Sequence, residues 1–198
     1  MTSKPDKSKY GLIREQPLTY DDYAALDDGN RYELLGGKLE LMSPAPTIKH
    51  QVISFEMQKR MASTCELEYL ILYSPVDLIL SATDVCQPDL VMIHRTRLDI
   101  LSARGIEGIP DLVVEILSPS SLKRDKLRKL KLYAASGIPE YWIVDPAGGT
   151  LEQHMLYEGR YDLCNIYIGD ESVRSERIAC LSFTMEDIMN SIPDLPNK

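Results

Sequence analysis

The sequence has no long hydrophobic run and no closely spaced pair of cysteines. No window approaches the roughly 20 apolar residues of a membrane span, and no apolar segment of a signal peptide follows the polar residues 1–10. We therefore expect a cytoplasmic protein without membrane segments. The four cysteines show no C-x-x-C spacing, and three of them lie in or beside apolar runs. This pattern favours buried thiols over a zinc site or a disulfide framework.

Basic residues are also fewer than acidic ones, with 22 lysines and arginines against 30 aspartates and glutamates. The formal net charge of −8 at pH 7 argues against a protein that holds nucleic acid by its overall electrostatic field. One segment departs from this balance, because residues 123–131 contain six lysines and arginines and only Asp125 opposes them. A local basic edge of this kind can meet a phosphate backbone even on an acidic protein.

The length and composition are those of one ordinary globular domain. The 198 residues, 44% hydrophobic and 26% charged, are enough for a single sizeable core, and we find no internal repeat or low-complexity tract. Residues 1–17 are polar and contain two prolines, so we expect a flexible N-terminal arm. The remaining residues, 18–198, are expected to form a single domain.

Hydrophobic periodicity and turn residues predict the order of the elements. Thr19 is expected to cap a first short helix, Gly36-Gly37 to form the turn of a hairpin, and Gly137 to end a basic helix. In chain order we expect a helix over 20–26, a hairpin over 31–42, a helix over 50–62, strands over 69–73, 76–80, 86–93 and 110–117, a polar connection with helical character over 98–108, a helix capped by Ser120 or Ser121, a meander over 139–157, 161–168 and 175–180, and a helix over 184–190 capped by Thr184.

On a helical wheel, the predicted basic helix has a polar strip beside an apolar face. Asp125, Lys129 and Tyr133 follow one another at i, i+4 and i+8, which places them in one polar strip. This strip borders an apolar face, where a side chain can reach over the end of a sheet. The apolar face comprises Leu127, Leu130 and Ala134, and the opposite face comprises Arg124, Arg128 and Lys131.

Two predicted strands each carry one carboxylate. Asp89 lies at the start of the first apolar run, directly after Pro88, and Glu115 lies near the end of the second run. A charge beside a sheet core costs several kcal/mol unless it is paired or binds a metal. Either residue alone is more often solvated, a helix cap or half of an ion pair. Together, and followed by a lysine-rich helix, they indicate a partner cation, which is a lysine or Mg²⁺.

Two further polar residues, Glu33 and His50, each have a structural and a functional interpretation. In the hairpin, alternation places Glu33 on the face of Arg31 and Leu35, either as a surface carboxylate or as a third acidic group near the site. His50, near the start of its helix, is expected to be solvated or to cap the helix rather than to act in catalysis.

Several blocks resemble a known family over about residues 19–157. They are Tyr32-Glu33-Leu34 with the Gly-Gly turn, Gln87-Pro88-Asp89-Leu90-Val91, Glu115-Ile116-Leu117-Ser118-Pro119-Ser120, the Asp125, Lys129 and Tyr133 strip, and the stretch from Gly137 to Pro146. In this order they resemble the PD-(D/E)XK nuclease superfamily and, within it, the Uma-two endonuclease family. The resemblance implies an α/β (α+β) fold with a restriction endonuclease-like core, in which a mixed central sheet is flanked by helices. An N-terminal hairpin and a C-terminal antiparallel extension complete it.

The resemblance also implies an activity and a set of site residues. The superfamily lysine expected two residues after Glu115 is replaced by Leu117, which implies a migrated lysine, with Lys129 as first choice and Lys126 as second. The implied enzyme is an endodeoxyribonuclease that uses Mg²⁺ or Mn²⁺. Asp89, Glu115 and the Ile116 carbonyl would supply hard oxygen ligands. Lys129 would orient and help deprotonate the attacking water or neutralise the phosphate, Tyr133 would donate a hydrogen bond, and Glu33 would bind a second ion or hold Lys129.

The expected partner is DNA. Cutting both strands with one site per chain favours a homodimer. Leu117 at the expected lysine position and the acidic net charge motivate an alternative, a catalytically inactive nuclease-like module that binds nucleic acid or protein. A hydrolase of another phosphate ester is a third reading.

Overall fold

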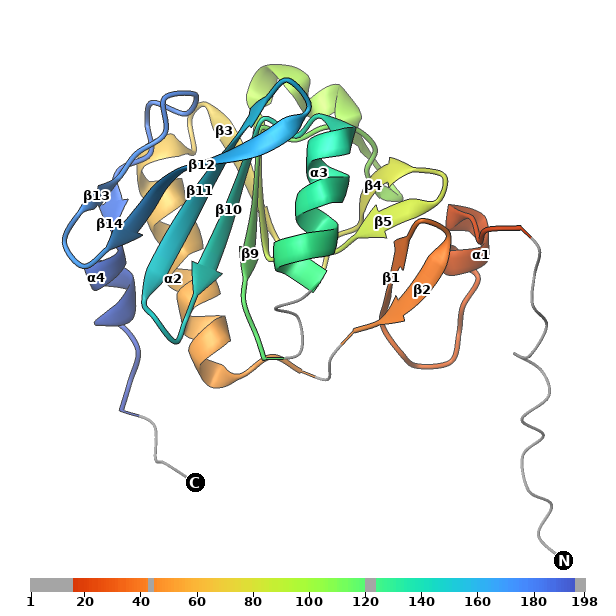
Figure 1. Cartoon of the computed structure of the whole chain (residues 1–198), viewed down its shortest axis with the longest axis horizontal. Helices are drawn as coiled ribbons and strands as arrows, with labels where there is room; N and C mark the ends of the chain where they lie inside the picture. The colour runs from red at the N-terminus through yellow and green to blue at the C-terminus, as the bar shows by residue number, and fades with distance from the viewer. Residues whose placement is uncertain (1–15, 43–44, 120–123, 195–198) are drawn as a thin grey trace, which may run out of the picture.

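The computed structural model describes residues 16–42, 45–119 and 124–194. Most of the expected N-terminal arm and the expected caps Ser120 and Ser121 lie outside these ranges. Within them, the strands form two six-stranded sheets and one two-stranded sheet. Figure 1 shows the sheet that contains the N-terminal hairpin at one side of the molecule, together with α1 (Tyr20–Ala24).

The central sheet has the strand order β12-β11-β10-β9-β6-β3. The pair β9 and β10 is parallel, whereas the other neighbours are antiparallel, so the sheet is mixed as expected. A parallel pair needs a crossover connection, and the helical segment between β9 and β10 supplies it. The strands are β3 (Tyr69–Tyr73), β6 (Leu90–His94), β9 (Leu112–Ile116), β10 (Glu140–Asp145), β11 (Thr150–Tyr157) and β12 (Arg160–Ile168).

The other large sheet contains the predicted hairpin, and the four strands predicted over residues 69–117 are divided between the two large sheets. The 86–93 run is divided, because Cys86 ends β5 in one sheet and Leu90 begins β6 in the other. Pro88 lies between them and has no N–H to continue a strand ladder. In the order β2-β1-β5-β4-β8-β7, the strands are β2 (Lys38–Leu41), β1 (Tyr32–Leu35), β5 (Asp84–Cys86), β4 (Leu78–Ser81), β8 (Gly105–Ile106) and β7 (Leu101–Ser102).

The connection over 98–108 is also different from the prediction. A 3₁₀ helix, η2 (Arg95–Ile100), covers its beginning, and the short strands β7 and β8 follow. The helical character is therefore confined to the first residues of the segment.

The helices begin and end at residues suited to those positions. Thr19 caps α1 through a capping box, and Thr47 accepts a hydrogen bond from the His50 N–H at the start of α2 (Ile48–Cys65). Gly137, with φ of 87°, ends α3 (Leu130–Ser136) in the left-handed conformation, as predicted. Thr184 caps α4 (Met185–Met189), also as predicted. No helix of the described residues has both the length and the apolar character needed to cross a membrane.

The basic segment forms a π-helix before it becomes an α-helix. Residues Arg124–Lys129 make up η3, which continues into α3. Because a π-helix bonds i to i+5, each residue turns through a smaller angle than the 100° assumed for the wheel. The side chain of Leu127, expected on the apolar face, is accordingly exposed, whereas Ala134 of α3 is buried.

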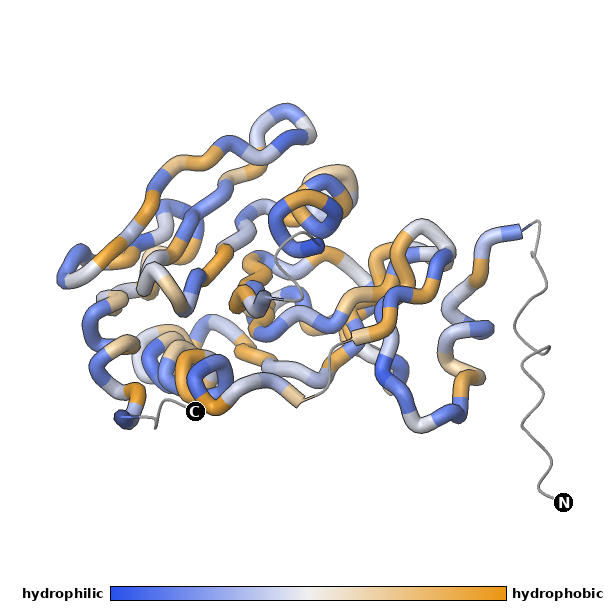
Figure 2. The backbone as a smooth tube through the Cα atoms, turned by 60° about the horizontal axis from the view of Figure 1, so that its bottom comes forward, coloured by the Kyte–Doolittle hydropathy of each residue, from blue (hydrophilic) through white to orange (hydrophobic). Residues whose placement is uncertain are grey.

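The two faces of the central sheet are covered by different elements (Figure 1). Leu112, Val114 and Ile116 of β9 join the core with α2 and the C-terminal segment, and Val113 joins the core with Tyr133 of α3. This division follows from the period of two in a strand. Hydrophobic stretches accordingly run through the interior strands and helices, and hydrophilic residues occupy many of the turns (Figure 2).

The C-terminal part confirms the meander of β10, β11 and β12 but not its extension over 175–180. Instead, β13 (Ser172–Val173) pairs with β14 (Phe183–Thr184) in a separate small sheet. The buried Glu140 explains the difference, since it accepts hydrogen bonds from Ser175 Oγ at 2.6 Å and Gln153 Nε2 at 2.7 Å. The chain is thereby held at the central sheet rather than continuing as another meander strand.

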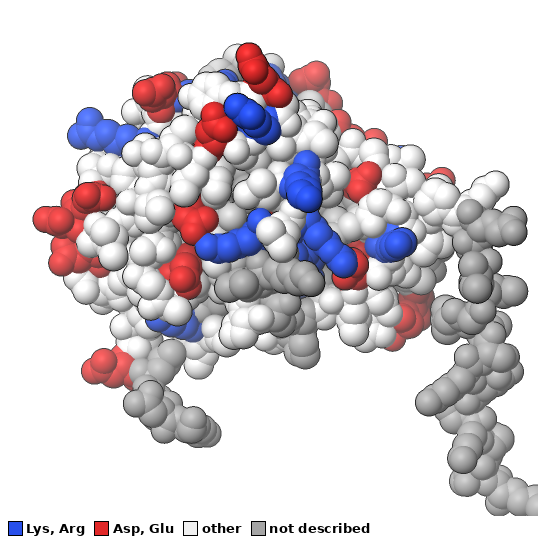
Figure 3. Space-filling model, in the orientation of Figure 1, with Lys and Arg blue, Asp and Glu red and all other residues white. Residues whose placement is uncertain are grey.

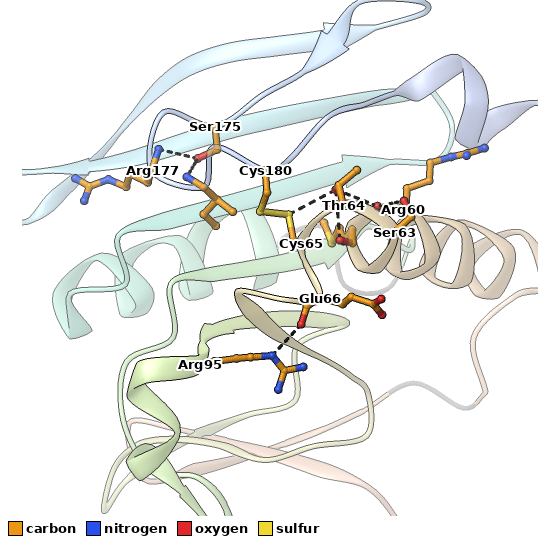
Figure 4. Close-up of a disulfide and its surroundings, with 11 residues drawn as sticks. Arg60, Ser63, Thr64, Cys65, Glu66, Arg95, Ser175, Arg177 and Cys180 are labelled. Carbon is orange, nitrogen blue, oxygen red and sulfur yellow. Dashed lines mark hydrogen bonds between the residues drawn. A yellow bond between two sulfur atoms is a disulfide. The ribbon is translucent and has the colours of Figure 1, made fainter.

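A disulfide joins Cys65, at the end of α2, to Cys180 in the C-terminal segment (Figure 4). The two Cα atoms are 5.3 Å apart although 115 positions separate the residues. The expectation of free buried thiols is therefore wrong for this pair. It is correct for Cys86, which is free and buried, while Cys164 is free and exposed.

Replacing both Cys65 and Cys180 with serine is expected to lower the free energy of unfolding by about 2–4 kcal/mol, because the unfolded chain loses a long-range constraint. Urea denaturation under non-reducing conditions measures this change. Cys164→Ser is the matched control and should leave the stability within about 0.5 kcal/mol of the parent. Four reactive thiols in the denatured parent protein would contradict the disulfide.

Candidate active site

Strand geometry brings Asp89 and Glu115 to one point. Glu115 is two residues from Val113 and so lies on the α3 face of β9. The β6 and β9 register pairs Leu90 with Val114, and one further step places Asp89 beside Glu115. Asp89 Oδ2 accepts a hydrogen bond of 2.7 Å from the Ile116 N–H. Both carboxylates line a cavity of about 440 Å³.

Lys129 lies between carboxylates from the two large sheets. Its Nζ is 2.7 Å from Glu115 Oε1 and 2.7 Å from Glu33 Oε1, and it is 3.7 Å from Asp125 Oδ1. Only 1% of the Lys129 side chain is exposed. Glu33 Oε1 also accepts the Gln87 N–H at 3.0 Å. The hairpin carboxylate is therefore a third acidic group of this cluster and not a surface residue.

Tyr133 lies one helical turn after Lys129 and contacts the same carboxylate. Its hydroxyl donates to Glu115 Oε1 at 2.8 Å, and its ring packs edge-on against Tyr141 with centroids 5.1 Å apart. The Tyr141 hydroxyl donates to the Asp125 carbonyl at 3.2 Å. These contacts connect the helical segment to the strands on which the acidic residues are carried.

Arg124 is a member of the cluster that the sequence did not indicate. Its Nε lies 3.2 Å from Glu33 Oε2 and 3.6 Å from Asp125 Oδ1. The helical wheel placed Arg124 on the outer face, and the π-helix accounts for that error. Arg124 is one of six basic residues over 123–131, and their pattern gave no signal that one guanidinium would turn inward.

His50 is the second residue that sequence reasoning missed. It neither caps α2, which Thr47 does, nor lies in solvent, since its side chain is only 11% exposed. Its Nε2 is 3.1 Å from the Ile116 carbonyl oxygen and 3.3 Å from Asp89 Oδ2. The available signal was Thr47 three residues earlier, because an N-cap at Thr47 leaves His50 free of that role.

Lys126, the second candidate for the displaced lysine, lies elsewhere. Its Nζ is 2.6 Å from Glu152 Oε1 on β11, and about a third of its side chain is exposed. Lys129 therefore contacts the carboxylates of the cavity, and Lys126 makes an ion pair outside it.

The crowding of acidic groups alters the protonation equilibria of the cluster. Burial raises the pKa of Glu115 well above its ordinary value, and Asp125, Asp89 and Glu33 raise it further, although Lys129 opposes them. Burial lowers the pKa of Lys129, but the attraction of the surrounding carboxylates, Glu115 first, outweighs it and raises the pKa well above the ordinary value. Lys129 is therefore an ammonium ion. Burial likewise raises the pKa of Tyr133, which remains a neutral donor.

The donor set fits a hard divalent cation. Two carboxylates, Asp89 and Glu115, and the Ile116 carbonyl supply oxygen atoms of the kind that Mg²⁺ and Mn²⁺ prefer. Among residues 16–42, 45–119 and 124–194, no three histidine, cysteine, aspartate or glutamate side chains already form a closed metal-binding group. The Ile116 carbonyl would add a backbone oxygen to the two carboxylates in such a coordination set.

Lysine and arginine side chains gather on the outer surface around α3 (Figure 3). Arg128 and Lys131 are exposed there, and Lys126 is partly exposed. Arg128 is paired with Glu40 of the hairpin, as Lys126 is with Glu152. The basic edge expected from the sequence thus lies beside the cluster of buried carboxylates.

Comparison with known proteins identifies the family. The chain is similar to a solved protein described as "a putative nuclease belonging to DUF820 from Anabaena variabilis ATCC 29413", with 19% identity, a TM-score of 0.73, and coverage of 89% of this chain and 100% of the other. This likeness shows the restriction endonuclease-like fold. A search of curated proteins gives no match. A family model covers residues 19–186, so the chain belongs to the Uma2 family, described as "Putative restriction endonuclease".

Proposed function

We propose that the protein is a metal-dependent endonuclease that hydrolyses phosphodiester bonds of DNA. The observation that carries this proposal is the ion pair of 2.7 Å between Lys129 and Glu115 in a cavity that Asp89 also lines. Membership of the Uma2 family supports a nuclease-like function.

Hydrolysis of a phosphodiester requires a nucleophilic water and stabilisation of the charge that grows on the phosphoryl and leaving oxygens. A bound Mg²⁺ or Mn²⁺ would act as a Lewis acid on a phosphoryl oxygen and would lower the pKa of its own bound water below that of free water. Asp89, Glu115 and the Ile116 carbonyl would hold this ion. The 2.7 Å hydrogen bond from the Ile116 N–H fixes the Asp89 carboxylate in position for this task.

Lys129 acts as a donor and a positive charge rather than as a base. Its raised pKa keeps the amine protonated, so it orients water or neutralises a phosphate oxygen. Glu33 holds the amine, because both Glu33 oxygens are engaged by Lys129, Arg124 and the Gln87 N–H, which disfavours the second-ion role. Tyr133 orients the Glu115 carboxylate through its hydroxyl.

DNA would approach from the basic edge around α3 and reach the cavity, where Arg31 and Arg124 are among the lining residues. Arginine and lysine contacts to phosphates fix the position of a duplex without reading its sequence. One cluster of this kind per chain cuts one strand, so cleavage of both strands calls for a homodimer.

The test is a cleavage assay on supercoiled plasmid with Mg²⁺ or Mn²⁺. We expect nicked and then linear DNA, no cleavage in EDTA, and slower hydrolysis of bis(4-nitrophenyl) phosphate than of DNA. The preparation of an Asp89→Asn variant serves as the control for contaminating nucleases. DNA binding without cleavage, together with no divalent-metal binding by calorimetry, would instead establish the inactive nuclease-like module.

A further inference from the structure

The position of His50 extends the donor set of the proposed metal site. Its Nε2 lies 3.3 Å from Asp89 Oδ2 and 3.1 Å from the Ile116 carbonyl oxygen, and these are two of the three oxygen donors proposed above. Adjacent ligands of an octahedral ion with bonds of about 2.1 Å are about 3.0 Å apart. The separations from Nε2 to both oxygens therefore suit neighbouring positions around one ion.

The imidazole is held in this place by the fold. Thr47 fixes the first turn of α2 by accepting the His50 N–H at 3.2 Å, and the His50 side chain is almost fully buried at the cavity wall. Its other ring nitrogen, Nδ1, is buried and has no hydrogen-bond partner among the described residues. Without an ion, Nε2 carries a proton and faces two oxygen acceptors. A bound ion would take the place of that proton, and Nδ1 would then carry the proton of the neutral ring.

A purely structural histidine is the competing explanation, in which Nε2–H holds Asp89 and the Ile116 carbonyl together. Asp89 Oδ2 is already bonded to the Ile116 N–H at 2.7 Å, so the strand end is joined without the imidazole. The two roles differ in one measurable respect, which is whether His50 nitrogen enters the coordination sphere of a bound ion.

We infer that His50 is a direct ligand of the divalent ion, together with Asp89 and the Ile116 carbonyl, and that it makes the site prefer Mn²⁺ to Mg²⁺. The inference rests on the proposed function, which supplies the ion. An all-oxygen site suits Mg²⁺, whereas imidazole nitrogen favours transition-metal ions. Replacing the nitrogen with an amide should therefore weaken binding of Mn²⁺ more than binding of Mg²⁺.

The experiment is Mn²⁺ binding to the full-length protein, with calorimetry for affinity and electron spin echo modulation for nitrogen ligands. We expect one bound Mn²⁺ with ¹⁴N modulation from one imidazole. In His50→Gln the modulation should disappear and the Kd for Mn²⁺ should rise about tenfold or more, while the Kd for Mg²⁺ changes less. His94→Gln, at a histidine outside the cavity, should keep both the modulation and the affinity.

The outcomes separate this inference from the function on which it rests. Bound Mn²⁺ without ¹⁴N modulation in the parent would overturn the role of His50, and loss of affinity in Asp89→Asn would then still support the metal-dependent enzyme. Absence of Mn²⁺ binding in the folded parent would overturn both. Circular dichroism checks that each variant is folded, and the modulation of the parent decides the question even if His50→Gln does not fold.

Discussion

Lys129→Met is expected to lower the free energy of unfolding by about 3–5 kcal/mol and to abolish DNA cleavage. Removing one partner of a buried ion pair leaves the others uncompensated, and here three carboxylates, Glu33, Glu115 and Asp125, lose their shared ammonium. Methionine matches the length of the lysine stem, so the change isolates the charge and the hydrogen bonds. Urea denaturation measures the stability, and the plasmid assay measures the activity.

Lys126→Met is the matched control, since Lys126 lies in the same π-helix and its ion pair with Glu152 is partly exposed. Its cost should be about 0–1 kcal/mol, with cleavage retained. Adding Glu33→Gln to Lys129→Met should restore part of the lost stability, because Arg124 then faces one buried carboxylate fewer in the absence of the ammonium. Equal stability of the two lysine variants would show that the cluster does not depend on Lys129.

Asp89→Asn and Glu115→Gln are each expected to slow plasmid cleavage by about a thousandfold. A bound metal ion contributes several kcal/mol to stabilisation of the transition state, and a loss of roughly 4 kcal/mol corresponds to that factor. The amide side chains keep the shape of the carboxylates but are poor ligands for a hard cation. Initial rates at saturating Mn²⁺ and at limiting Mn²⁺ distinguish lost metal affinity from lost chemistry.

Glu115→Gln is expected to lower the cleavage rate without lowering the stability of the folded protein. Its raised pKa means that the folded state disfavours the ionised form, so the neutral Gln side chain should leave the denaturation midpoint unchanged or raise it at neutral pH. Asp111→Asn is a control at the other end of β9, where Asp111 binds Arg97 at 2.7 Å and lies outside the cavity. It should lose stability but keep cleavage. Full activity of Asp89→Asn and Glu115→Gln would reject their proposed roles.

Local patterns predicted most of the strands, although the 86–93 run is divided and residues 175–180 form no strand. They placed Asp89 and Glu115 on consecutive predicted strands, and the register of β6 with β9 brings the two residues to the same face. Caps and turns at Thr19, Gly137 and Thr184 were readable for the same reason, since each depends on a few neighbouring residues. The family resemblance implied a displaced lysine, and the strip that Lys129 shares with Asp125 and Tyr133 selected it over Lys126.

The remaining features depend on contacts between distant parts of the chain. The Cys65–Cys180 bond spans 115 positions, and the approach of His50 to Ile116 spans 66, so neither leaves a local pattern. The inward turn of Arg124 required the π-helix, whereas a periodicity argument assumes α-helical geometry throughout. Pro88 was the sequence signal for the division of the 86–93 run, because proline has no N–H for a strand ladder. A prediction from apolar runs alone does not use this signal.

The ammonium of Lys129 bonds to Glu33 on β1 and to Glu115 on β9, which belong to different sheets. Neither sheet alone contains the complete charge cluster, so the proposed activity would require both sheets to be folded together. A fragment that begins after Met42 would keep Asp89, Glu115 and Lys129 but would lack the hairpin carboxylate that shares the amine. A shortened protein that lacks the hairpin would therefore leave Lys129 without one of its two closest carboxylates.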